Sequence, residues 1–270
     1  MAPVEKIGYF GEPTASIDWC EHNYEISFYI AEFWNTASNL FLIVPPLMGF
    51  IKSKAQGMEM RFLICHLSVL VIGIGSFLFH MTLLFHMQLM DEIPMIYGTS
   101  VIGYSLYQIR EPLGRKNWLL ASLLLTYCLV FTVAYLAFKD PYIHEGMFIF
   151  LTLGLIWLGL RQYYDSDHSL RERKCTRLFQ MGLVCYALGG LSWNADNHLC
   201  PRLTHLRRQV LPMWLTALSQ LHAWWHFFSG IGTYFIITSF IGFRLRFLKT
   251  PFHIQWRWFG PIVQIKSSSA

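Results

Sequence analysis

Three histidines have the type and spacing of metal ligands. His222 and His226 are four residues apart in an apolar run, so they lie one turn apart on the same face of a predicted helix. His80 lies near the end of a different apolar run, four residues after Ser76. Two imidazoles from one helix and a third from another can hold a tetrahedral zinc ion and leave one position open for water. The spacing therefore predicts a zinc site of the catalytic type.

Each of these signals also has a simpler explanation. A histidine pair at this spacing occurs often by chance, and a single histidine within a membrane is more often a hydrogen-bonded packing residue. Ser76 follows Gly73 and Gly75, and small residues of this kind allow helices to pack closely. However, an ionisable group in the middle of a span costs about 2.5–3.5 kcal/mol on insertion scales. His80, Asp91 and the histidine pair together therefore favour a metal site.

The elements that position these residues are predicted to be membrane-spanning helices. The chain is 54% hydrophobic and 14% charged, whereas soluble domains carry about 25% charged residues. Apolar segments of about 20 residues can cross the hydrocarbon core. We expect an all-α fold in one domain, residues 1–270, with a tight hairpin formed by the second and third of seven transmembrane helices. These spans are Phe28–Ile51, Phe62–Phe85, Met87–Ile109, Trp118–Phe138, Tyr142–Leu160, Arg177–His198 and Leu215–Phe243.

The distribution of Lys and Arg predicts the orientation of the chain. Cytosolic loops carry an excess of these residues. The start of the chain lacks the basic and then apolar pattern of a signal peptide, so the first span is expected to insert the chain. Residues 1–27 then form a lumenal or extracellular segment, and residues 244–270 form a cytosolic tail. The excess of basic residues is thus a topology signal and does not indicate nucleic acid as a partner. Every Lys and Arg falls on the cytosolic side except Lys6, Lys139, Arg202, Arg207 and Arg208.

This orientation brings the polar residues to one depth. The second span ends outside, and the third and seventh spans start there, so His80, Asp91 and the His222–His226 pair should meet near the outer leaflet. The other polar groups at membrane depth are Glu32 and Glu92. The remaining histidines are expected to matter much less, because they do not share the face and depth of the three ligands. They include His86, His144, His198 and His205.

The pattern Ser76-x-x-x-His80, Asp91 and His222-x-x-x-His226 resembles that of a group of seven-span hydrolases that includes the adiponectin and progestin receptors. More specific blocks, from residue 18 to about residue 230, resemble the alkaline ceramidase family and its branch acting on long-chain substrates. These blocks are Asp18-Trp-Cys-Glu21, Ala31-Glu-Phe-Trp-Asn-Thr36, Phe79-His-Met-Thr-Leu83, Gln88-Leu-Met-Asp-Glu-Ile-Pro94 and Trp193-Asn-Ala-Asp-Asn197.

The resemblance implies a reaction and a role for each residue. Zinc would be held by His80, His222 and His226, with Asp91 as the general base for the water. Ser76 would help to hold the metal, the water or the developing oxyanion. The substrate would be ceramide, and the products a sphingoid base and a fatty acid. The expected location is the endoplasmic reticulum or Golgi membrane, with membrane lipids as surroundings and no nucleic acid or obligate protein partner.

The acidic N-terminal segment is a second candidate metal site. Asp18, Glu21, Asn23 and Glu32 supply oxygen ligands in a short stretch, and the Trp19 carbonyl is available. Such ligands suit calcium, and the resemblance likewise implies calcium here. The alternative is helix capping, because a Ser, Thr or Asp followed three residues later by Glu is also the pattern of a capping box.

Cys20 and Cys200 both face the oxidising side in the predicted topology. A disulfide between them is the pairing that the compartment favours, and two free lumenal thiols are the alternative. This bond would join the predicted calcium segment to the loop before the seventh span. The other cysteines lie within spans or near the cytosol; they are Cys65, Cys128, Cys175 and Cys185.

Two other functions compete with lipid amide hydrolysis. A receptor related to the adiponectin and progestin receptors would keep the zinc site, with residual lipid hydrolase activity. The ceramidase-like blocks and the predicted lumenal site argue against it. A transporter would need a polar path through both leaflets, and the inner halves of the spans carry few ionisable residues. The sequence does not indicate which acyl chain is preferred.

Overall fold

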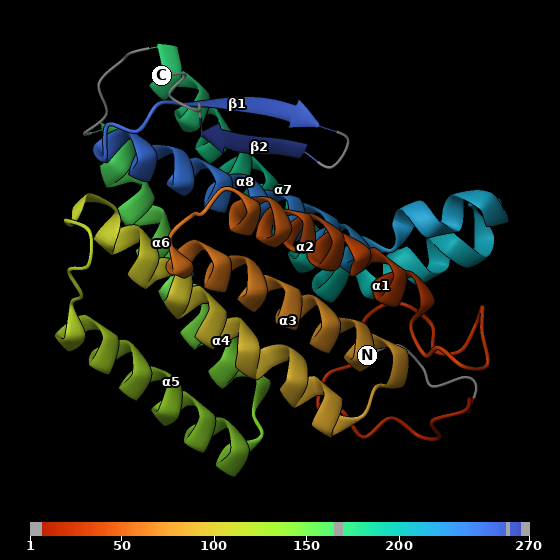
Figure 1. The fold of residues 1–270 in the computed structure, drawn as a ribbon. Coiled ribbons are helices and arrows are strands. Elements are labelled where there is room, and N and C mark those ends of the chain that lie inside the picture. The colour runs from red at the N-terminus through yellow and green to blue at the C-terminus, as the bar shows by residue number, and fades with distance from the viewer. Residues whose placement is uncertain (1–6, 165–169, 258–259, 266–270) are drawn as a thin grey trace.

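The computed structural model describes residues 7–164, 170–257 and 260–265. The described chain is mostly helical, as predicted, with two short strands near the C-terminus (Figure 1). The elements in chain order are α1 (Phe33–Ser38), α2 (Leu40–Ala55), α3 (Met60–Thr82), α4 (Phe85–Tyr107), η1 (Gln108–Arg110), α5 (Trp118–Phe138), α6 (Pro141–Tyr164), α7 (Leu170–Gln209), η2 (Met213–Ser219), α8 (Leu221–Phe247), β1 (Phe252–Arg257) and β2 (Gly260–Ile265).

Four helices among the described residues are long and apolar enough to cross a membrane, namely α3, α5, α6 and α8. The other three large helices do not combine this length with this apolar character. Helix α2 has only 16 residues, α4 carries Asp91 and Glu92, and α7 continues for 40 residues into charged sequence at both ends. The structure therefore supports a helical membrane protein, and the count of seven spans and the orientation stay predictions.

Helices α3 and α4 form the tight hairpin that the sequence predicts. Leu83 ends α3 in the left-handed conformation, with φ of 52°, and α4 begins two residues later at Phe85. Within the hairpin the two backbones touch at Gly75, where an added Cβ would lie 1.9 Å from the carbonyl oxygen of Met90. This contact requires glycine. It also brings Ser76 and Asp91, the residues that follow Gly75 and Met90, to the same level.

Helix α8 lies at the centre of the bundle. It packs against α1, α2, α3 and α7, and most of its side chains are buried. At Gly230 an added Cβ would lie 2.4 Å from the carbonyl oxygen of Phe41, so α2 and α8 approach each other closely. Helix α5, in contrast, lies at the edge of the bundle and exposes much of its apolar surface (Figure 1).

The first helix begins later than predicted. Helix α1 starts at Phe33, after a non-helical stretch over residues 18–32, and a turn at Asn39 separates it from α2. A capping box for a helix beginning at Asp18 is therefore wrong. The Glu21 carboxylate instead accepts hydrogen bonds from the backbone N–H groups of Trp34 at 2.7 Å and Asn35 at 2.8 Å, so it satisfies the start of α1 from outside the helix.

The described part of the expected C-terminal tail contains two strands, so the all-α expectation is incomplete. Helix α8 continues to Phe247, and β1 then pairs antiparallel with β2, with Phe252 opposite Ile265 and Ile254 opposite Val263. The hairpin packs against α8 and α2 at the end of the bundle away from the N-terminal segment (Figure 1). The apolar residues of β1 alternate with polar ones, which is the period-2 pattern of a half-buried strand, whereas β2 buries three successive residues, Pro261–Val263.

A buried arginine holds this end of the bundle together. Arg244 is only 1% exposed and lies near the end of α8. Its Nε donates to Glu59 at 2.5 Å, and its Nη1 donates to the carbonyl oxygens of Ile109 at 2.8 Å and Glu111 at 2.5 Å. A buried guanidinium is stable only when it is paired and hydrogen-bonded, and here both conditions are met.

Candidate metal centre and active site

The three predicted zinc ligands meet in the structure. His80 lies in the last turn of α3, and His222 and His226 lie in the first two turns of α8. All three are buried, and each offers a ligand atom within 4.8 Å of the other two. Their ring centroids are 4.6–5.1 Å apart. The predicted convergence of the two helices is confirmed.

Contacts at Nδ1, on the ring edge that faces away from the other histidines, fix the imidazoles of His80 and His226. His80 Nδ1 lies 2.5 Å from Glu32 Oε2, and His226 Nδ1 lies 2.8 Å from the Ser38 hydroxyl and 3.1 Å from the Asn35 carbonyl oxygen. Such partners are typical of metal-bound histidines, because they set the tautomer and turn the other ring nitrogen toward the metal. The donor set therefore fits a metal ion.

His222 is positioned differently. Its ring stacks on the indole of Trp19, with centroids 3.7 Å apart and an angle of 18°, and its backbone N–H donates to Asp196 Oδ1 at 3.3 Å. Its Nδ1 is buried and has no hydrogen-bond partner among the described residues. A buried ring nitrogen of this kind is costly unless it binds something, and a metal ion would satisfy it.

Ser76 and Asp91 lie on the wall of a cavity of about 530 Å³ that His222 and His226 also line. Both side chains are buried. Away from the histidines the cavity is mostly apolar and is lined by residues such as Val69, Ile72, Ile102 and Leu183. A cavity of this size, with a few polar groups at one end, has the form of a site for an apolar ligand with a polar reacting group.

The N-terminal acidic residues also come together. Glu21, Asn23 and Glu32 are buried, and Asn23 Nδ2 donates to the Asp18 carboxylate at 3.3 Å. Burial, together with the neighbouring Glu32 carboxylate, raises the pKa of Asp18 to about 7 and that of Glu21 to about 8. The Asn23 side-chain oxygen is buried without a hydrogen-bond partner among the described residues. Clustered oxygen ligands that are costly to charge suit a hard cation.

Glu32 belongs to both clusters. It is fully buried, its Oε1 accepts from the backbone N–H of Trp19 at 3.1 Å, and its Oε2 contacts His80 Nδ1. The sequence suggested a connection between the two candidate sites only through the disulfide. The structure shows a direct one, since a single carboxylate reaches from the acidic segment to a predicted zinc ligand.

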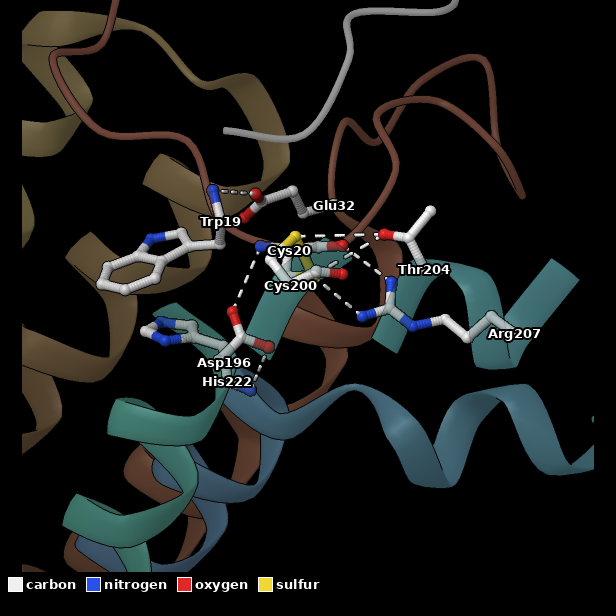
Figure 2. The surroundings of a disulfide bond; sticks show 8 residues. All are labelled: Trp19, Cys20, Glu32, Asp196, Cys200, Thr204, Arg207 and His222. Carbon is white, nitrogen blue, oxygen red and sulfur yellow. Dashed lines mark hydrogen bonds between the residues drawn. A yellow bond between two sulfur atoms is a disulfide. The ribbon is translucent and has the colours of Figure 1, made fainter. Parts of the chain in front are cut away.

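The predicted disulfide between Cys20 and Cys200 is present, with Cα atoms 5.3 Å apart. Figure 2 shows how it is surrounded by two residues whose roles the sequence did not reveal. Asp196 accepts from the Cys20 N–H at 3.1 Å and from the His222 N–H, and Arg207 donates to the Cys20 carbonyl at 2.7 Å. Asp196 therefore ties the acidic segment to the start of α8. Asp196 lies in the Trp193–Asn197 block of the predicted sixth span. A carboxylate within a span is costly, and this cost was the sequence signal that could have identified Asp196 as a site residue.

The structure also corrects the expectation for one of the other histidines. His144, in the first turn of α6, lines the same cavity as Asp91 and His222, so it lies nearer to the candidate site than the sequence indicated. Its distance in the sequence from the other polar residues concealed this. His86, by comparison, is exposed at the start of α4.

The fold and the site define a helical protein of membrane type with a buried three-histidine cluster that can hold a metal ion. A sequence model of the Ceramidase family matches residues 11–265. The chain is 38% identical to the mouse (Mus musculus) protein alkaline ceramidase 3, over 92% of this chain and 91% of that protein. It is 32% identical to an alkaline ceramidase of Saccharomyces cerevisiae, over 93% and 84% of the two chains. It is also 29% identical to an alkaline ceramidase of Arabidopsis thaliana, over 84% and 82%. The chain belongs to the alkaline ceramidase family.

Proposed function

We propose that this chain is a zinc-dependent intramembrane amidase that hydrolyses ceramide to a sphingoid base and a fatty acid. The observation that carries the proposal is the buried cluster of His80, His222 and His226 beside a cavity lined by Asp91 and Ser76. Membership of the alkaline ceramidase family supports ceramide as the substrate, since the relatives reported above are named as ceramidases.

The three histidines would hold the zinc ion; a carboxylate behind His80 and a carbonyl behind His226 would keep those two rings in position, and the Trp19 indole would do so for His222. Zinc, when bound, lowers the pKa of water and polarises an amide carbonyl. Glu32 would accept the Nδ1 proton of His80, and the Asn35 carbonyl would accept that of His226, since each oxygen lies at hydrogen-bond distance from Nδ1. These contacts leave the other nitrogen of each ring as the ligand.

Asp91 would take the proton of the attacking water and later deliver it to the leaving amine, which is the usual work of a carboxylate general base. Ser76, close to Asp91 through the α3–α4 contact at Gly75, would donate a hydrogen bond to the developing oxyanion. The apolar part of the cavity would hold an acyl chain and exclude water from it.

Asp18, Glu21, Asn23 and Glu32, with the Trp19 carbonyl, would bind calcium. The raised pKa values of Asp18 and Glu21 support this role, because a cation would stabilise the charged forms that burial disfavours. Through Glu32, calcium would fix the orientation of His80. Calcium would therefore support the zinc site structurally and take no part in the reaction.

We further propose that α2, α4 and α7 span the membrane together with α3, α5, α6 and α8, as one domain over residues 1–270. The N-terminal segment would face the lumen of the endoplasmic reticulum or Golgi, or the outside, and the β hairpin would face the cytosol. The disulfide supports this orientation, because disulfides persist in oxidising compartments. None of the relatives reported above carries a receptor name, so the receptor alternative gains no support.

The test is hydrolysis of ceramide by the purified protein, with fatty acid and sphingoid base measured and zinc determined by metal analysis. The parent should carry about one zinc and release both products. The double variant His222→Ala, His226→Ala should lose zinc and turnover. His198→Ala is the matched control, because His198 is exposed on α7 and should change neither. Full turnover by the double variant would remove the zinc mechanism, and an inactive, zinc-loaded parent would remove ceramide as the substrate.

A further inference from the structure

A second polar pair lines the cavity beside the proposed zinc site. Glu92 follows Asp91 on α4, and His144 lies at the start of α6. Both are buried, and both face the cavity that Asp91, His222 and His226 line. The proposed hydrolysis needs neither of them. Because a buried ionisable pair in a span is costly, it calls for a function.

The Glu92 carboxylate is held by its neighbours. Its Oε2 accepts from the Tyr135 hydroxyl and from Gln88 Nε2, the latter at 3.1 Å. Its Oε1 lies 3.7 Å from His144 Nδ1. One oxygen is therefore committed to α4 and α5, and the other faces the imidazole of α6.

His144 presents an unused nitrogen. Its Nε2 is buried and has no hydrogen-bond partner in the part of the chain that the structure describes. The ring is stacked on Phe148, with centroids 5.9 Å apart and an angle of 18°. Because a carboxylate faces Nδ1, the proton belongs on Nδ1, and Nε2 carries a lone pair. A buried acceptor on a residue that lines the cavity suits a ligand that donates a hydrogen bond, such as a hydroxyl group.

The position of the pair matches the polar part of a lipid. Glu92 and His144 line the same cavity as Asp91 and His222, and His144 lies in the first turn of α6 as His222 lies in the first turn of α8. In a sphingoid base the hydroxyl groups are on the two carbons next to the one that carries the amide nitrogen. A lipid with its amide at the histidine cluster therefore has its hydroxyls near this pair, while its chains extend along apolar surface.

We propose that Glu92 and His144 form a subsite that binds a hydroxyl group of the sphingoid base, with the hydroxyl donating to His144 Nε2. Glu92 is the positioning residue, because its carboxylate lies 3.7 Å from Nδ1 and favours the proton on that nitrogen by its charge. This inference rests on the proposed function and deepens it, since it assigns the part of the cavity that distinguishes a sphingoid amide from a simple fatty amide.

The test compares three substrates with the same acyl chain, namely ceramide, its 1-deoxy analogue and its 3-deoxy analogue. His144→Phe keeps a flat ring beside Phe148 but removes the acceptor. Loss of one hydrogen bond should lower kcat/KM about 10-fold for ceramide and for one deoxy analogue. The analogue that lacks the bound hydroxyl should change less than about 2-fold. Tyr135→Phe removes one hydrogen bond to Glu92 and should give the same pattern more weakly. His86→Phe, on the exposed start of α4, is the matched control.

The same comparison can be made without turnover. The ligands are the free sphingoid bases of the three substrates, and their binding is measured as the rise in the melting temperature of the protein. Equal loss for all three lipids in both assays would overturn the subsite and assign His144 to packing. If the parent hydrolyses ceramide but the variants lose activity equally on all three lipids, the subsite fails and the proposed function stands. A parent that is inactive but shows the selective binding pattern keeps the subsite and removes the hydrolysis. If the parent neither hydrolyses ceramide nor binds the bases, both proposals fail.

Discussion

Replacement of Glu32 by Gln should weaken zinc binding at His80, although Glu32 is not a zinc ligand. Glu32 contacts three donors, namely the Trp19 N–H at 3.1 Å, Asn35 Nδ2 at 3.1 Å and His80 Nδ1 at 2.5 Å. Glu32→Ala would leave all three buried and unsatisfied, at about 1–3 kcal/mol each, or about 3–9 kcal/mol together. A loss of that size approaches the whole stability of a typical domain. Gln is therefore the informative change, since it keeps the shape and one acceptor oxygen.

The expected loss follows from the role of Glu32 behind the ligand. Removal of a hydrogen-bonded partner from a metal-binding histidine costs about 10- to 100-fold in metal affinity, or about 1.4–2.8 kcal/mol. The assay is competition for zinc between the purified protein and a chromophoric chelator, at saturating calcium. The expected result is an affinity about 10- to 100-fold below that of the parent, with a similar far-UV circular dichroism spectrum.

Glu21→Gln is the matched control for this measurement. Glu21 is also a proposed calcium ligand and is also buried, but its hydrogen bonds go to the backbone N–H groups of Trp34 and Asn35 and not to a histidine. It should weaken calcium binding and change zinc affinity less than about 2-fold. Parental zinc affinity in Glu32→Gln, alongside weakened calcium binding in both variants, would refute the direct link through His80.

Asp91→Asn should keep zinc and the melting temperature but lower turnover by about 10²–10⁴-fold, because it removes the proton acceptor and preserves shape; near-normal turnover would assign the proton to another group. Cys20→Ser opens a bond between residues 180 apart, and the chain-entropy relation gives an upper value of about 5 kcal/mol for the lost stability. The check is the melting temperature of the parent and of Cys20→Ser, each with and without reductant. A parent whose melting temperature does not fall in reductant contradicts the prediction. The pKa values of Asp18 and Glu21 are raised to about 7 and 8, so the folded state holds these protons more tightly than the unfolded state. Without calcium, stability should fall as the pH rises from about 4 to about 8, and the calcium-induced rise in Tm should be larger at pH 9 than at pH 6. A calcium effect independent of pH would argue against ionisation of these carboxylates on binding.

The sequence predicted the histidine cluster because two local rules were enough. The four-residue spacing placed His222 and His226 on one helix face, and the cost of burying His80 in a span gave it a reason to meet them. The α3–α4 hairpin was predictable for a similar reason, since two apolar runs separated by almost no polar sequence must fold back on each other. The disulfide followed from the compartment assigned to Cys20 and Cys200.

Other features depend on contacts between distant segments, which local patterns do not encode. The Asp196 carboxylate bridges Cys20 and His222, and only the folded chain reveals that bridge. His144 was set aside because it was not expected to share the face and depth of the three ligands, yet α6 packs on α4 and brings it to the cavity. The β hairpin is different. Its alternation over Phe252–Arg257 was visible in the sequence, but residues 244–270 were assigned only to a cytosolic tail, and no strand was predicted there.

The central position of α8 has a consequence for the biosynthesis of the protein. His222 follows His80 by 142 residues (222 − 80), so at about 5–20 residues per second the ribosome supplies α8 about 7–28 s after the α3 histidine. Through that interval Glu32, His80 and Asp91 must sit in the nascent protein without the helix that later buries them. Unpartnered polar groups of this kind are costly within a membrane, and chaperones and proteases continuously triage incompletely folded chains. A premature stop before residue 221 should therefore eliminate the protein itself by degradation, and not merely its activity.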